Sequence, residues 1–289
     1  MPASRTAEVL RLSDGRRLGY ADYGDRHGTP LLFFHGTPGS RRVARWADLV
    51  ARRRGIRLIA PDRPGFGLSD FQPGRTLGAW PRDVVELADA LCLERFAVAG
   101  VSGGAPYVAA CAWRLPDRLS HAGIISGMGP IDDPALAAAL PRHYRTGFAL
   151  VRRVPGAARA AFGLGMLGLR RAPGCVLASI AASLPEMDRA IVARPRVQAL
   201  LLDDAREALR QGPRGAALEL SLLSRPWDVR LDQIRVPVRL WHGEADAQVP
   251  VAIAHRLAAA LPDCRARFLP NAGHLWVLDH LGEVLATLA

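Results

Sequence analysis

The chain has 289 residues, of which 49% are hydrophobic and 22% charged, enough for a large buried core in a single α/β unit. All 38 basic residues are arginine, and with 27 acidic residues they give a formal net charge of +11. These arginines are scattered and accompany no nucleic-acid motif, so we favour a compositional bias over a polyanionic partner.

Three further features bear on the compartment. The longest apolar stretch, Ala160–Leu169, is about half of what a membrane span requires, so no transmembrane segment is predicted. The first twelve residues carry charges and lack the apolar region of a signal peptide. The cysteines form no C-x-x-C pair and fit no zinc site, so we expect buried thiols and a cytoplasmic protein without a metal. They are Cys92, Cys111, Cys175 and Cys264.

The first half of the chain alternates short apolar runs with amphipathic segments. An Asp-Gly step within residues 8–23 indicates a hairpin. Continuous apolar runs such as Pro30–His35 are typical of strands buried on both faces. The predicted strands are Pro30–His35, Arg57–Ala60, Phe96–Val101 and His121–Ser126, and the predicted helices are Arg41–Arg54, Leu77–Leu91 and Ala105–Leu115.

The pattern changes at Met128. Residues 128–227 show helical spacing and no convincing strand, and strands return at Val236–Trp241 and Ala266–Leu269, with helices at Val251–Leu261 and Leu275–Leu288. Strands alternating with helices predict an α/β fold with a mostly parallel sheet covered by helices on both faces. We expect residues 1–127 and 228–289 to form this core and residues 128–227 to form an inserted helical cap.

One pentapeptide carries the clearest chemical signal. Residues 100–104, Gly-Val-Ser-Gly-Gly, match G-x-S-x-G and lie between a predicted strand and a predicted helix. A sharp strand-to-helix turn lifts the serine out of the sheet in a strained conformation, and the helix that follows points its first amides at the site. This context favours a nucleophilic Ser102 over an incidental serine in a glycine-rich turn.

A serine hydroxyl needs a base to take its proton, and the chain offers eight histidines. His274 follows the last predicted strand. It therefore lies at the same edge of the parallel sheet as Ser102. His242 and His255 are less well placed, because the first lies at a strand end beside a glycine and the second on a helix.

The base in turn needs an acid that fixes its tautomer and stabilises its cationic form. Asp246 follows the penultimate predicted strand and so reaches the same edge of the sheet. Glu244 is a weaker candidate because it lies nearer the strand. Asp132 or Asp133, after the strand that ends at Ser126, is a further alternative.

The loop at residues 35–40, His-Gly-Thr-Pro-Gly-Ser, follows the third predicted strand. Such a loop can aim a backbone N–H at the oxygen that becomes negative during acyl transfer. We predict that the amides of Thr37 and Gly103 form this oxyanion hole, although a Pro-Gly pair alone also signals an ordinary turn. His35 and Trp227 are candidate substrate contacts.

These motifs together resemble the α/β-hydrolase superfamily over nearly the whole chain, in its capped branch with a serine nucleophile. The chain order Ser102, Asp246, His274 is also the order of that superfamily. The resemblance implies a central sheet of about eight strands and a helical cap over the active site. It rests on the pentapeptide, on His35–Pro38, on the loop Asp62–Ser69, on Gly243-x-x-Asp246 and on Gly273-His274.

Two departures narrow the comparison. Epoxide hydrolases and haloalkane dehalogenases are similar at residues 35–38 but use an aspartate nucleophile, where this chain has Ser102. Proline iminopeptidases usually carry His-Gly-Gly-Pro-Gly and a tryptophan after the nucleophile, where this chain has Thr37 and Gly103.

The sequence thus predicts a serine hydrolase that cleaves an ester or related acyl bond of a small molecule through an acyl-enzyme, without a cofactor. The alternatives are a cofactor-free lyase, cyclase or acyltransferase on the same fold and, more weakly, a ligand-binding receptor. Fourteen arginines against eight acids in residues 131–226 raise the possibility of an anionic substrate, although a solvated helical surface explains them more simply. We expect no specific nucleic-acid partner, and a monomer and a homodimer both remain open.

Overall fold

A computed structural model describes residues 4–131 and 134–288. Within these residues eight strands form one sheet in the order β1-β2-β4-β3-β5-β6-β7-β8. The β1–β2 and β2–β4 pairs are antiparallel and all other pairs are parallel, which confirms the predicted α/β class. The strands are β1 (Arg5–Arg11), β2 (Arg17–Gly24), β3 (Thr29–Phe34), β4 (Ile56–Pro61), β5 (Phe96–Val101), β6 (Leu119–Ile125), β7 (Val238–Gly243) and β8 (Cys264–Leu269).

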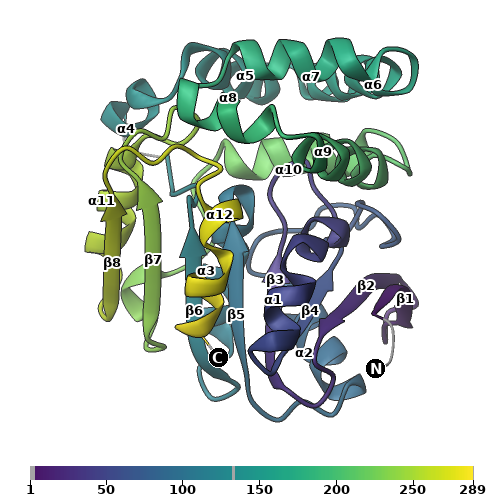
Figure 1. Ribbon diagram of the computed structural model, residues 1–289, viewed down its shortest axis with the longest axis vertical. Coiled ribbons are helices and arrows are strands. Elements are labelled where there is room, and N and C mark those ends of the chain that lie inside the picture. Colours follow the sequence, from purple (N-terminus) through teal and green to yellow (C-terminus); the bar gives the residue numbers. More distant parts are fainter. Residues whose placement is uncertain (1–3, 132–133, 289) are drawn as a thin grey trace.

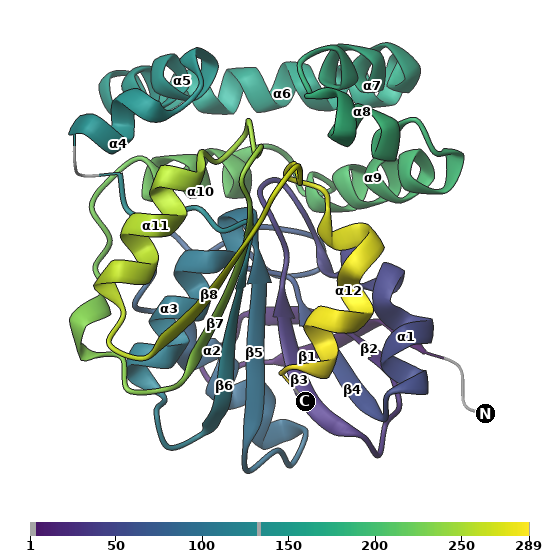
Figure 2. The same ribbon diagram turned by 60° about the vertical axis from the view of Figure 1, so that its left-hand side comes forward.

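Helices cover both faces of this sheet, so its central strands are apolar on both sides. Helices α2 (Trp80–Ala90), α3 (Ala105–Arg114) and α11 (Val251–Ala260) pack on one face. The 3₁₀ segment η1 (Arg41–Ala47), helix α1 (Asp48–Arg53) and helix α12 (Val277–Ala286) pack on the other. Figure 2 shows the sheet between α3 and α11 on one side and α1 and α12 on the other.

Between β6 and β7 the chain forms helices and, in the described residues of this stretch, no strand. These inserted helices lie across one end of the sheet (Figure 1). Helix α9 packs against η1 of the core, and α5 and α10 pack against α6. The inserted helices are α4 (Pro134–Ala139), α5 (Arg142–Arg153), α6 (Pro155–Arg171), α7 (Pro173–Ala182), α8 (Glu186–Val192), α9 (Pro195–Ala208) and α10 (Arg214–Leu223).

One predicted helix differs in the structure. The single helix expected over Arg41–Arg54 is a 3₁₀ segment followed by an α-helix. Its first amides bond to groups outside the helix: Arg41 N–H donates to Asp62 Oδ1 at 2.6 Å, and Ser40 N–H donates to Asp204 Oδ1 at 2.9 Å. Tight 3₁₀ turns are common at such helix starts.

None of the helices in residues 4–131 and 134–288 combines the length and the apolar character that crossing a membrane requires.

Candidate active site

Ser102 lies at the turn between β5 and α3. Its φ angle of +54° is in the left-handed region, which costs free energy for a residue with a side chain. The neighbouring glycines make the turn possible, because a Cβ on Gly100 would lie 2.8 Å from the carbonyl oxygen of Gly104. A Cβ on Gly104 would in turn collide with the Phe34 carbonyl. The sequence folds here into a strained elbow that presents the serine.

His274 and Asp246 form a hydrogen-bonded pair beside this elbow. Nδ1 of the imidazole donates to Asp246 Oδ2 at 2.7 Å. The other carboxylate oxygen accepts from the backbone N–H groups of Gln248 and Val249, each at 2.8 Å. Burial raises the pKa of Asp246, but the charge and hydrogen bond of His274 outweigh burial and lower it. The acid is therefore ionised and fixed in place.

Of the alternative bases, His242 also lies near the acid, with its Nε2 3.5 Å from Asp246 Oδ2. Neither His242 nor His255, however, lines the cavity that contains Ser102. Glu244 is exposed, and His255 stacks on the Phe268 ring at 3.9 Å between centroids. His242 is fully buried, donates from Nε2 to the Val249 carbonyl at 2.8 Å, and has its pKa lowered by burial. Asp132 and Asp133 lie outside the described residues.

The loop after β3 comes close to the elbow at Gly103. An ideal Cβ built on Gly103 would lie 2.9 Å from Thr37 Cβ and 3.4 Å from Thr37 N. The two amides that were predicted to hold an oxyanion thus come from neighbouring segments of backbone, and both Thr37 and Ser102 line the same cavity.

A cluster of buried charged side chains is hydrogen-bonded to this loop at residues 35–40. Glu219 of α10 accepts from Thr37 Oγ1 at 3.1 Å and from Arg63 Nε at 2.9 Å. Its other oxygen accepts from Arg75 and from the Tyr107 hydroxyl, each at 2.5 Å. Burial raises the pKa of Glu219, but the two arginines outweigh burial and lower it to about 2. The insertion is thus tied to the loop through a fully ionised carboxylate.

The two predicted substrate contacts do not line the cavity. His35 is buried; its Nδ1 donates to the Gly36 carbonyl at 2.8 Å and its Nε2 accepts from Arg63 N–H at 3.2 Å. Burial and the Arg63 charge hold the pKa of this imidazole well below its usual range, so His35 is neutral and holds the loop. Trp227 packs against the hydrophobic cluster of α2 and α3.

Another carboxylate of the insertion, Asp188, contacts the backbone at His274 and Leu275. Asp188 of α8 is fully buried, and its two oxygens accept from the backbone N–H groups of His274 and Leu275, each at 2.8 Å. Its charge also raises the pKa of the His274 imidazole, after the larger effects of burial, which lowers that pKa, and of Asp246, which raises it.

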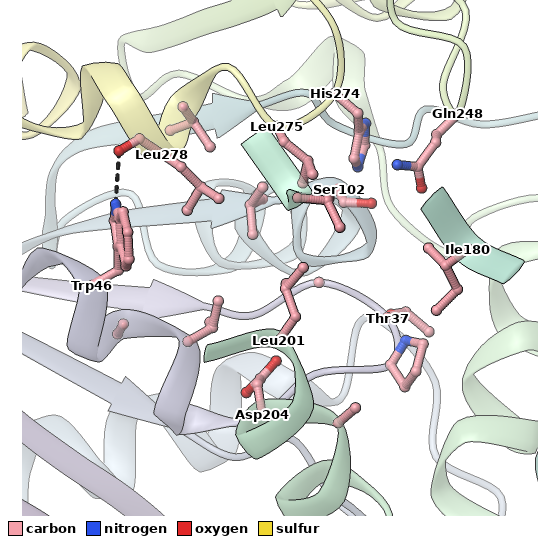
Figure 3. A pocket seen from close by; sticks show the side chains of 18 of the residues that line it. Thr37, Trp46, Ser102, Ile180, Leu201, Asp204, Gln248, His274, Leu275 and Leu278 are labelled. Carbon is pink, nitrogen blue, oxygen red and sulfur yellow. Dashed lines mark hydrogen bonds between the residues drawn. The ribbon is translucent and has the colours of Figure 1, made fainter. Parts of the chain in front are cut away.

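Ser102 and His274 face a cavity of about 300 Å³, at the lower end of the range for small-molecule sites. Figure 3 shows both side chains at its wall, together with Thr37 and Gln248. Helix α9 adds Asp204, whose pKa burial raises to about 7 against the opposing hydrogen bonds from Ser40.

Sequence patterns missed Asp188, Asp204, Glu219 and Gln248. The only signal for Asp204 is its spacing of four residues from Leu200 and from Ala208 on the buried face of α9. An acidic residue on such a face is usually paired or hydrogen-bonded, but its partner in the core is not encoded in the spacing.

The fold agrees with comparison to known families. The family model described as alpha/beta hydrolase fold matches residues 29–281, so the chain belongs to that family. The resemblance predicted from the motifs is thereby confirmed.

The individual relatives match either over part of the chain or at low sequence identity. The chain is 37% identical over 126 residues to a non-heme chloroperoxidase of Streptomyces lividans (43% of this chain, 45% of the relative). It is 43% identical over 74 residues to a pimeloyl-[acyl-carrier protein] methyl ester esterase of Aromatoleum aromaticum (26% and 29%). These two matches span less than half of the relatives' length. Haloalkane dehalogenase 2 of Mycobacterium tuberculosis is 28% identical across 94% of this chain and 90% of its own.

Solved structures share the fold over nearly their full length. A thermophilic esterase from Thermogutta terrifontis superposes with a TM-score of 0.69 at 22% identity, covering 98% of this chain and 97% of the esterase. The enol-lactonase from Burkholderia xenovorans LB400 gives a TM-score of 0.72 at 18% identity, with 97% and 99% covered.

Proposed function

We propose that the protein is a serine hydrolase that cleaves an ester or related acyl bond of a small molecule. The observation that carries this proposal is the hydrogen-bonded Asp246–His274 pair at a cavity that also contains the strained Ser102. Esterase is also the activity named for a relative and for several structural neighbours. A serine in place of aspartate argues against the dehalogenase chemistry named for another relative.

The proposed reaction has two steps, formation of an acyl-enzyme and its hydrolysis. His274 Nε2 takes the Ser102 hydroxyl proton while Oγ bonds to the substrate carbonyl carbon, and the amides of Thr37 and Gly103 stabilise the resulting oxyanion. The C–O bond to the leaving group then breaks, and His274 gives the proton to the departing alcohol. Water repeats the sequence on the acyl-enzyme, which releases the acid and restores the serine.

The inserted helices act as a cap in this proposal. Side chains of α6, α7, α8 and α9 line the cavity together with residues of the core, so these helices contact a substrate that is bound there. In this proposal residues 128–227 form the cap, and residues 1–127 and 228–289 form the catalytic core.

Covalent labelling tests the nucleophile. Purified protein and its Ser102→Ala variant are treated with a small fluorophosphonate, and the adduct is mapped by mass spectrometry. We expect one adduct per chain on Ser102 and none in the variant. Folded wild-type protein without any adduct would overturn the proposal.

Product analysis separates hydrolysis from the non-hydrolytic alternatives. With simple esters as substrates, we expect free acid to appear in step with the alcohol. Alcohol release without free acid, in the presence of an added acceptor alcohol, would instead indicate an acyltransferase.

A further inference from the structure

The cavity extends away from Ser102 into the core, between η1 and α12. We call this part the apolar arm. It lies in the hydrophobic cluster on the face of the sheet that η1, α1 and α12 cover. Its lining residues come from β3, β4, η1 and α12; they are Phe33, Ala44, Ala47, Leu58, Val277, Leu281 and Leu285.

The side chains explain why this space is not filled. Val277, Leu281 and Leu285 follow one another at intervals of four residues, so they lie on one face of α12. From η1 on the other side the cavity is lined by Ala44 and Ala47, whose side chains end at Cβ, and by Val43 and Trp46. The indole N–H of Trp46 donates to the Leu278 carbonyl of α12 at 2.7 Å, so its polar atom is already paired. A gap walled by alkyl groups and aromatic rings has no partners for water and suits a hydrocarbon.

Charges on the cavity wall point the same way. In the described part of the chain no arginine lines this cavity, and its ionisable side chains are Tyr144, Asp204 and His274. The fourteen arginines of residues 131–226 therefore give no support to an anionic substrate. A carboxylate in the ligand would meet none of the described arginines on this wall, and the imidazole there, that of His274, is already paired with Asp246.

We infer that the apolar arm binds an uncharged alkyl part of the substrate, so that the protein prefers neutral esters with a medium-length hydrocarbon chain. This inference rests on the proposed function of Ser102. Each methylene that enters the arm raises kcat/KM by about threefold to fourfold until the arm is full, since it leaves water for an apolar wall.

Two ester series test the inference. One is p-nitrophenyl esters from acetate to dodecanoate, which vary the acyl chain; the other is acetates of alcohols from methanol to dodecanol. We expect kcat/KM to rise with length and then fall in one series. A flat or falling profile in both series would overturn the inference.

Variants assign the length limit to the arm. Ala47→Leu fills the arm and is expected to move the optimum to shorter chains while acetate hydrolysis persists. Leu281→Ala enlarges it and is expected to move the optimum to longer chains. Val284→Ala, on the same helix but outside the cavity lining, is the matched control for lost core packing and leaves the optimum in place. An optimum that stays fixed in both arm variants contradicts the inference.

Charge and chemistry are tested separately. The p-nitrophenyl monoester of octanedioic acid should be turned over at least tenfold less efficiently than the octanoate ester; the reverse order would overturn the inference. Calorimetry with decanol on Ser102→Ala requires no reaction. Decanol binding without any ester hydrolysis would refute the proposed function but would support the inference that the arm binds an alkyl chain. Ester hydrolysis without length preference and without decanol binding would refute the arm alone.

Discussion

At the scale of single residues, the charge of His274 depends on its neighbours. Burial opposes the imidazolium and lowers the pKa, but the charge of Asp246 and its 2.7 Å hydrogen bond outweigh burial, so the pKa is raised above the ordinary value. A general base acts in its neutral form. A raised pKa therefore moves the onset of activity to higher pH.

The pH profile of ester cleavage should show this shift. We expect kcat/KM to rise with pH through a pKa above about 6.5 and then to level off. In Asp246→Asn the lost charge moves the onset to lower pH, and the wrong tautomer reduces the plateau kcat on the order of 10⁴-fold. Asp279→Asn, which breaks the exposed pair with Arg194, is the control and should keep both the pH of onset and the plateau kcat. An unchanged onset in Asp246→Asn would contradict the assignment.

Asp188 acts on the same histidine through the backbone. Because its two oxygens hold the amides of His274 and Leu275, Asp188→Ala should loosen the loop and lower kcat by up to about 10²-fold with little change in KM. Asp188→Asn keeps one acceptor oxygen, so its kcat should lie between those of Asp188→Ala and wild type. Both variants should start to act at lower pH, since the charge that raises the His274 pKa is gone. A loss of stability alone, with the pH profile unmoved, would leave Asp188 a merely structural residue.

At the scale of elements, the inserted helices meet the core through buried carboxylates. Asp204 of α9 accepts from the Ser40 N–H and hydroxyl at 2.9 and 2.6 Å, at the start of η1. Burial raises its pKa to about 7 in the folded protein, against about 3.9 in an unfolded chain. The folded state therefore holds this proton more tightly, and the stability from this group is lost as pH rises between those two values.

Replacing this group tests that linkage. Asp204→Asn keeps an acceptor oxygen for Ser40 but cannot ionise. From about pH 4 to about pH 7 wild type should lose on the order of a few kcal/mol of unfolding free energy relative to the variant. Urea unfolding at several pH values measures the difference. Asp203→Asn, next on the same helix and half exposed, should run parallel to wild type. Parallel curves for Asp204→Asn as well would show that the carboxyl ionises freely.

The contrast between strands and inserted helices explains which site residues could be predicted from the sequence and which could not. The strands are short apolar runs, so the sequence predicts them directly. Because the C-terminal ends of parallel strands meet at one edge of the sheet, the sequence also predicts that residues following β5, β7 and β8 lie close together. Asp188, Asp204 and Glu219 belong to helices whose docking depends on side-chain packing across the cavity. His35 shows the same limit, because its burial under Arg63 depends on how the next loop folds back.

At the scale of the whole molecule, burial of ion pairs does not reduce the formal charge of +11, because three buried arginines are matched by three buried acids. Arg41, Arg63 and Arg75 are buried and paired: Arg41 contacts Asp62 and Glu207 at 2.7 Å each, and the other two contact Glu219. The remaining arginines are distributed over core and insertion alike. Such a surface attracts polyanions through general charge and offers no built recognition of bases.

Binding to duplex DNA should follow from that charge alone. Two unrelated duplexes of equal length should bind with equal affinity in fluorescence anisotropy at low salt. Raising the salt from about 50 to about 200 mM should weaken both by at least about tenfold, because each phosphate contact releases counterions. Affinity for one of the duplexes that survives the higher salt would contradict this, since only contacts to bases or to a particular DNA shape resist screening and discriminate between sequences.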